Sequence, residues 1–197
     1  MKYRQFFARI LSIAVRVSLV ALPLVRATKA EAVEKLPLVW PPLGGFETYA
    51  AVPAAAIIGA FGVIPAMLMT KKRARFQGYL TLACALICLF VYSFFFITLV
   101  QGVAIPGDGT RYFTIGTVRT AAAMREFPHA TNEQLIEAAG VRGEGDLERA
   151  WTATSIKLAE LELLVSYVCL MASVNYAVGA FARATKGAKE ATPLDTE

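Results

Sequence analysis

The sequence predicts an all-α integral membrane protein: a four-helix transmembrane bundle with a small, mostly helical extramembrane loop domain between helices three and four. Three observations predict this class. Apolar residues make up 56% of the 197 residues. Residues 76–102 contain no charged side chain, and a helix of that length exceeds the hydrocarbon core of a bilayer, which is about 30 Å thick. Most charged residues lie between or beyond the long apolar runs.

Residues 1–30 contain no acidic side chain, and three interpretations fit them. They form a retained first transmembrane helix, a signal peptide cleaved near Ala30, or an organelle-targeting presequence. Arg16 favours the retained helix, because a charge in the middle of the apolar stretch is unfavourable in a signal peptide. We expect Arg16 to face protein, water or lipid headgroups, since a charge at mid-depth is costly in lipid.

Residues 31–48 contain several prolines and the pair Gly44-Gly45, which predicts a loop. Residues 49–70 are uncharged and predict the second transmembrane helix. Small residues spaced four apart let two helix backbones approach closely. This helix carries two such pairs, which we expect at a helix-packing interface: Ala55 with Gly59, and Gly62 with Ala66.

Residues 71–75 contain four Lys and Arg side chains, and short loops rich in these residues mark the cytoplasmic side of a membrane. We therefore expect a basic cytoplasmic loop there, followed by the third transmembrane helix over residues 76–102. Aromatic residues are crowded toward the end of this helix, and we expect them to face lipid. They are Phe90, Tyr92, Phe94, Phe95 and Phe96.

Residues 103–155 are polar and predict a folded extracytoplasmic domain. Thr131 and Gln134 have capping-box spacing before an apolar helical face, and Gly140 is placed to end that helix. A second short helix is expected to begin with Asp146 as its cap and to carry Trp151 toward the membrane surface. The β-branched and aromatic residues 112–118 fit a short extended stretch, although Thr117 is also a possible helix cap.

The fourth transmembrane helix is predicted over residues 156–182, followed by a basic cytoplasmic tail over residues 183–197 that we expect to be disordered. The positive charges together place both termini in the cytoplasm of a plasma or inner membrane. N-terminal cleavage would leave three helices instead of four.

The sequence offers no catalytic set, metal site or cofactor motif. The single histidine, His129, stands beside a proline, and the cysteines lie in apolar runs: Cys84, Cys88 and Cys169. No zinc, thiol-redox, acyl-transfer or nucleotide-binding spacing occurs. The net charge of +5 does not indicate nucleic-acid binding, because the basic residues cluster at membrane boundaries.

A few polar residues lie within or near the apolar runs, where ionisable groups need a partner or a water-filled path. They are candidates for buried or pore-lining positions: Arg16, Glu160, Glu162 and Asn175. For Asn175, helix packing through a hydrogen bond is the favoured interpretation. For the two glutamates, solvation at the helix entrance competes with a role at the mouth of the bundle, where Glu160 would pair with Arg111 or Arg119.

These observations predict a non-catalytic multi-pass membrane protein that acts as an accessory, scaffold or assembly subunit of a larger membrane complex. Its partners would be other membrane subunits or copies of itself within the lipid bilayer. The alternative is a small homo-oligomeric pore whose polar lining contains the candidate residues above.

Overall fold

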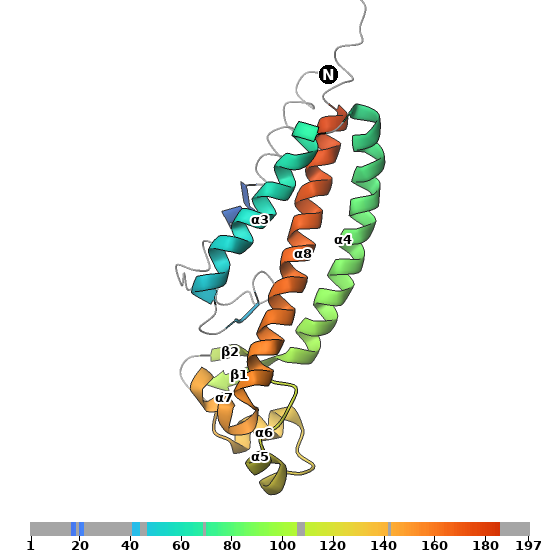
Figure 1. Ribbon diagram of the computed structural model, residues 1–197. Helices are drawn as coiled ribbons and strands as arrows, with labels where there is room; N and C mark the ends of the chain where they lie inside the picture. The colour runs from blue at the N-terminus through green and yellow to red at the C-terminus, as the bar shows by residue number, and fades with distance from the viewer. Residues whose placement is uncertain are drawn as a thin grey trace, which may run out of the picture. The chain divides into compact units, whose positions relative to one another are not determined.

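The computed structural model describes residues 17–18, 20–21, 41–43, 47–68, 70–105, 109–141 and 143–185. Helices account for 76% of them, and Figure 1 shows the elements. In chain order these are α3 (Glu47–Leu68), α4 (Lys71–Leu99), β1 (Val100–Ile105), β2 (Gly109–Thr114), α5 (Ala121–Glu126), α6 (Asn132–Ala138), α7 (Glu144–Ala150) and α8 (Ala153–Thr185). Arg16 and most of the predicted first helix lie outside the described residues.

The chain divides into two compact units. Unit 1 consists of Met1–Leu24, Val52–Leu89 and Val168–Glu197, and unit 2 consists of Val25–Ala51 and Phe90–Tyr167. Unit 1 therefore takes most of α3, the first part of α4 and the last part of α8. Unit 2 takes the ends of these helices together with the hairpin and the three short helices.

In unit 1, α8 contacts both α3 and α4. The rings of Tyr176 and Phe61 lie 6.4 Å apart, and the Tyr176 hydroxyl donates to Gln77 Oε1 at 3.1 Å. The rings of Phe181 and Tyr79 make an edge contact with centroids 5.1 Å apart. One helix thus supplies the packing surface for two others within this unit.

Among the described residues, two helices are long and apolar enough to cross a membrane, namely the segments Lys72–Leu99 and Ala153–Thr185. In α3 the apolar segment is shorter, Tyr49–Ile64. The structure therefore supports a mostly helical chain with two candidate spans, which is a coarser statement than the predicted four-helix bundle.

Two predicted boundaries around α4 are wrong. The basic residues 71–75 form the first turns of α4 and not a separate loop, because Lys, Arg and Ala are all good helix formers. At its other end the helix stops at Leu99, and Val100 begins β1, although the apolar run continues to Gly102. The tail predicted to start at residue 183 is also helical as far as Thr185.

The part of unit 2 that follows α4 begins with an antiparallel hairpin in which Val100 pairs with Thr114 and Ile105 with Gly109. Its sequences, VQGVAI and GTRYFT, contain β-branched and aromatic residues that favour strands. The predicted extended stretch is therefore present but starts earlier, and the domain is less helical than expected. Three short helices follow the hairpin (Figure 1).

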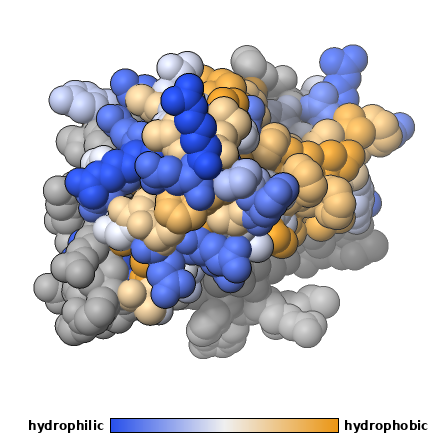
Figure 2. Space-filling model, turned by 90° about the horizontal axis from the view of Figure 1, so that it is seen from below, coloured by the Kyte–Doolittle hydropathy of each residue, from blue (hydrophilic) through white to orange (hydrophobic). Residues whose placement is uncertain are grey.

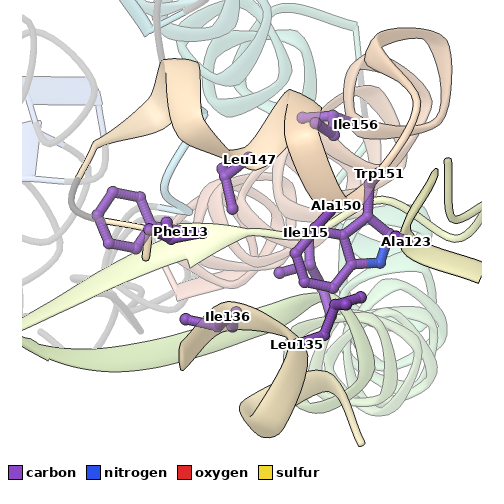
Figure 3. Close-up of a cluster of buried hydrophobic side chains, with 10 residues drawn as sticks. Phe113, Ile115, Ala123, Leu135, Ile136, Leu147, Ala150, Trp151 and Ile156 are labelled. Atoms are coloured by element: carbon purple, nitrogen blue, oxygen red, sulfur yellow. The ribbon is translucent and has the colours of Figure 1, made fainter. Parts of the chain in front are cut away.

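A hydrophobic core joins the hairpin to these helices, and Trp151 lies in it with 1% exposure. Figure 3 shows its indole beside Ile115, Leu135 and Ala150. The expectation that Trp151 points toward the membrane surface is therefore wrong. A tryptophan side chain buries more area than any other residue, so this position dominates the stability of a small core.

The short helices end and begin at the expected kinds of residue. Thr131 Oγ1 accepts from Gln134 N, and Gln134 Oε1 accepts from Thr131 N, which confirms the predicted capping box. Gly140 has φ of 61°, a left-handed conformation that favours glycine after a helix. The cap of α5 is Thr120 and not Thr117. Asp146 lies inside α7 and accepts from Gly143 N at 3.2 Å.

Candidate functional site

The two glutamates singled out in the sequence lie near the start of α8, in unit 2. Residues two apart on a helix are separated by about 200° around its axis, so Glu160 and Glu162 must face different surroundings. The structure places them in two different pockets, both within unit 2. Within one chain the two carboxylates therefore do not share a pocket.

Glu160 lines the larger pocket, which has a volume of about 600 Å³ and is called the Tyr112 pocket below. The side chains of Tyr49, Tyr112 and Leu161 form apolar parts of its wall. Lys157 and a second carboxylate, Glu148, also line it. Its charged groups are thus two carboxylates and one ammonium, which gives the pocket a net negative character.

Glu162 lines the smaller pocket, which has a volume of about 440 Å³ and is called the Arg119 pocket below. The last turns of α4 form one wall with Phe94, Phe95, Thr98 and Leu99. The segment after β2 and the start of α6 contribute the rest, including Gly116, Thr117, Arg119 and Asn132, together with Trp151 from the core. This pocket combines one cationic group, one anionic group and an aromatic wall.

Arg119 is held in place by the backbone around it. It forms an isolated antiparallel bridge with Trp151, and its Nη2 donates to Ala130 O at 2.8 Å and to Asn132 Oδ1 at 3.4 Å. The side chain is half-buried. These contacts hold the guanidinium in place without a ligand.

Arg119 and Glu162 line the same pocket but form no direct ion pair, and neither makes another ionic contact among the described residues. Arg119 therefore lines the pocket of Glu162 and not that of Glu160. The pocket therefore presents two opposite charges that do not neutralise each other through a direct ion pair.

Close backbone packing positions this wall against α8. A Cβ on Gly116 would lie 2.2 Å from Ser155 Oγ and 2.9 Å from Trp151 Cβ. Ser155 Oγ in turn donates to Val118 O at 3.2 Å. The segment that carries Arg119 is thereby fixed to the first turn of α8, the helix that carries Glu162.

Asn175 lies in unit 1, with 1% exposure. Its Nδ2 donates to Ile58 O at 2.7 Å, and a Cβ on Gly62 would lie 2.5 Å from the same nitrogen. The Oδ1 atom has no hydrogen-bond partner among the described residues. Asn175 therefore connects α8 to α3 through a position that only glycine permits, and the small-residue face predicted for this helix carries that contact.

The other residues of α3 that were predicted to pack against a helix are Ala55, Gly59 and Ala66. Ala55 is buried, and a Cβ on Gly59 would contact Val20 Cγ2 at 3.6 Å. The side chain of Ala66, like Arg16, lies outside the described part of the chain. Of the two predicted packing glycines, Gly62 thus has the tighter contact.

The aromatic end of α4 is not uniformly exposed. Phe90 and Phe94 are exposed, whereas Tyr92 has 2% exposure and makes an edge contact with Tyr167 of α8 at 5.8 Å between ring centroids. The Tyr92 hydroxyl has no hydrogen-bond partner among the described residues. The prediction that these aromatics face lipid therefore fails for Tyr92, which packs between the helices of unit 2.

His129 is exposed, the three cysteines are free, and the described residues contain no group of His, Cys, Asp and Glu suited to a metal ion. Comparisons with protein family models, curated proteins and solved structures found no match. The class of this protein therefore has to be inferred from its own helices and pockets.

Sequence reasoning missed the Arg119 pocket. Its lining comes from α4, the segment after β2, α6 and α8, and no local pattern brings these together. The sequence contained one signal for this pocket. Arg119 is a cationic residue in the predicted folded domain, and Glu162 is an anionic residue near the start of the predicted fourth helix.

Proposed function

We propose that the chain is a multi-pass integral membrane protein that acts, without catalysis, as an accessory, scaffold or assembly subunit of a larger membrane complex. The observation that carries this proposal is the exposed apolar surface of α4. Only 11% of its most apolar segment is buried, and Leu86, Ile87 and Phe90 are 62%, 65% and 75% exposed. A continuous apolar surface of this kind needs lipid or an apolar protein partner to cover it.

The same helix supports an orientation. With 29 residues at about 1.5 Å each, α4 is about 43 Å long, which is more than the thickness of the hydrocarbon core. Lys72, Arg73 and Arg75 are in its first turns, and its last residue leads into the folded segment of unit 2. We infer that the basic end is cytoplasmic and the folded segment extracytoplasmic.

We also propose a topology with four membrane spans. The first 30 residues, α3, α4 and α8 would be four spans with both termini in the cytoplasm of a plasma or inner membrane. The uncharged segment Tyr49–Ile64 of α3 fits this topology, since α3 and α8 are hydrogen-bonded inside unit 1.

The folded segment supports a role in association. It has its own buried core of ten residues, so it presents a defined surface and not a flexible loop. Figure 2 looks onto this end of the molecule and shows hydrophilic residues mixed with apolar ones. A non-obligate interface has about the same mixed composition as the rest of a protein surface, so this face needs no large apolar patch to bind a partner.

The alternative of a homo-oligomeric pore has less support. Asn175 uses its amide to join two helices, and Glu160 and Glu162 line separate pockets. A polar channel lining requires such residues to share one face.

Purification in mild detergent tests the subunit role. Mass spectrometry of the tagged protein, with a size measurement of the intact particle, should identify different polypeptides in fixed stoichiometry. A tagged unrelated membrane protein serves as the control for adventitious co-purification. A ring of identical copies that conducts ions in liposomes, and loses conductance with Glu162→Ala, would refute the proposal.

Labelling of single cysteines tests the orientation. In a variant without the three native cysteines, His129→Cys and Lys72→Cys each introduce a thiol at an exposed position. A membrane-impermeant maleimide added to intact cells should label the first variant and reach the second only after permeabilisation. The reverse pattern would invert the orientation.

A further inference from the structure

We propose that the Arg119 pocket binds the headgroup of a zwitterionic phospholipid, with the lipid phosphate at Arg119 and its ammonium group at Glu162. This inference rests on the membrane location proposed above. The proposed subunit role does not require a ligand in this pocket, and the inference adds a class of lipid that binds there.

The guanidinium of Arg119 is suited to bind the lipid phosphate. Nη2 of Arg119 makes both of the hydrogen bonds that hold the side chain. A guanidinium has five N–H donors in a fork that matches phosphate oxygens. The remaining donors make no hydrogen bond to another described residue. They are therefore available to an anionic oxygen in the pocket.

Glu162 supplies the opposite charge. Its half-buried carboxylate lines the same pocket and has no hydrogen-bond or ion-pair partner among the described residues. A carboxylate in this setting gains most from a ligand that brings its own positive charge. An anion alone would satisfy Arg119 and leave Glu162 with an added like charge, so the pair selects a ligand that carries both signs.

The apolar wall indicates that this ligand is a lipid. Phe94, Phe95 and Leu99 belong to the last turns of α4, where its apolar segment ends, and Phe94 is 58% exposed. Headgroups lie at this depth of a bilayer, and aromatic side chains are enriched there. An acyl chain would follow the exposed face of α4 while the headgroup occupies the pocket.

Volume and charge distinguish the Arg119 pocket from the Tyr112 pocket. A volume of about 440 Å³ lies within the range of about 300–1,000 Å³ that is typical of small-molecule sites. The Tyr112 pocket is larger but contains two carboxylates against one lysine. Its balance of charge does not favour a phosphate group.

Trp151 provides the readout, because it lines the Arg119 pocket and the chain contains one other tryptophan. In a Trp40→Phe variant, Trp151 is the only fluorophore of its kind. The detergent-solubilised protein is titrated with phosphatidylethanolamine and phosphatidylglycerol that carry bromine on their acyl chains. We expect quenching by the ethanolamine lipid at concentrations about tenfold lower, since the glycerol headgroup has no cation for Glu162.

Glu162→Gln should remove this preference, because the amide has no charge, and should leave binding of the glycerol lipid unchanged or tighter. Glu133→Gln, at an exposed position on α6, is the matched control and should keep the preference. Arg119→Lys should weaken binding of both lipids. Near-UV circular dichroism of each variant verifies that the Trp151 environment is intact.

Equal quenching by the two lipids, or an unchanged preference in Glu162→Gln, would refute the inference. Competition by soluble glycerophosphoethanolamine at equal concentration would assign the pocket to a free zwitterion instead of a lipid. Cysteine labelling decides the membrane orientation independently. A failed lipid preference in a correctly oriented protein therefore refutes this inference alone.

Discussion

Gly62→Ala should destabilise the helix packing of unit 1 through one side chain. The added Cβ would lie 2.5, 2.8 and 2.9 Å from Nδ2, Cγ and Oδ1 of Asn175, so the asparagine must move. That movement removes the hydrogen bond to Ile58 O, and such bonds between membrane helices contribute about 0.6 kcal/mol on average and about 1.7 at most.

Overpacking of a tight contact costs a further 1–3 kcal/mol or so, and the better helix propensity of alanine returns about 1 kcal/mol. We therefore expect Gly62→Ala to lower the free energy of unfolding by about 1–3 kcal/mol. Gly59→Ala is the matched control. Its Cβ would meet Val20 Cγ2 at 3.6 Å, an ordinary contact distance, so this variant should be neutral or slightly stabilised.

The assay is unfolding of the purified protein in mixed micelles by titration with sodium dodecyl sulfate, followed by circular dichroism. A double-mutant cycle completes the test. In the Asn175→Ala background the clash is absent, and Gly62→Ala should then cost less than about 0.5 kcal/mol. Equal costs for Gly62→Ala and Gly59→Ala, or an undiminished cost in the Asn175→Ala background, would refute the reasoning.

Three further predictions follow from the described contacts. Trp151→Ala should cost about 3–5 kcal/mol and make the segment after α4 sensitive to limited proteolysis, whereas Met124→Ala, which alters a 52% exposed side chain, should not. Thr131→Ala should cost about 1 kcal/mol and accelerate hydrogen exchange at the start of α6; unchanged exchange there would contradict the role of the capping box. In native membranes, a polar maleimide should label none of the free cysteines, because lipid separates them from an aqueous reagent, and all should react after denaturation; they are Cys84, Cys88 and Cys169.

Local signals predicted the parts of the fold that depend on neighbours in sequence. The capping box at Thr131 is confirmed because its two hydrogen bonds join residues three apart. The helical apolar segments of α4 and α8 were predictable from composition alone. An apolar run long enough to cross a bilayer can be recognised without tertiary information.

The errors came from features that composition does not encode. The apolar run through Gly102 contains no break at Leu99, so the change from helix to strand was not visible. The location of Trp151 was also wrong, because its burial depends on Ile115 and Leu135 (Figure 3). Charge marked residues 71–75 as a boundary but could not show that they are helical.

The candidate site was predicted only in its residue types. Asn175 was assigned to helix packing, and the structure gives it a hydrogen bond to α3. Glu162 and Arg119 line one pocket only because four segments of the chain meet there, and no spacing in the sequence indicates that they meet.

The junction between α4 and β1 has a mechanical consequence. The helix ends at Leu99, the strand begins at Val100, and Ile115 N donates to Leu99 O at 2.8 Å. No loop separates the two elements, and the residue after β2 is hydrogen-bonded to the last carbonyl group of the helix. A force applied to the hairpin is therefore transmitted to the last turn of α4 through a single peptide unit.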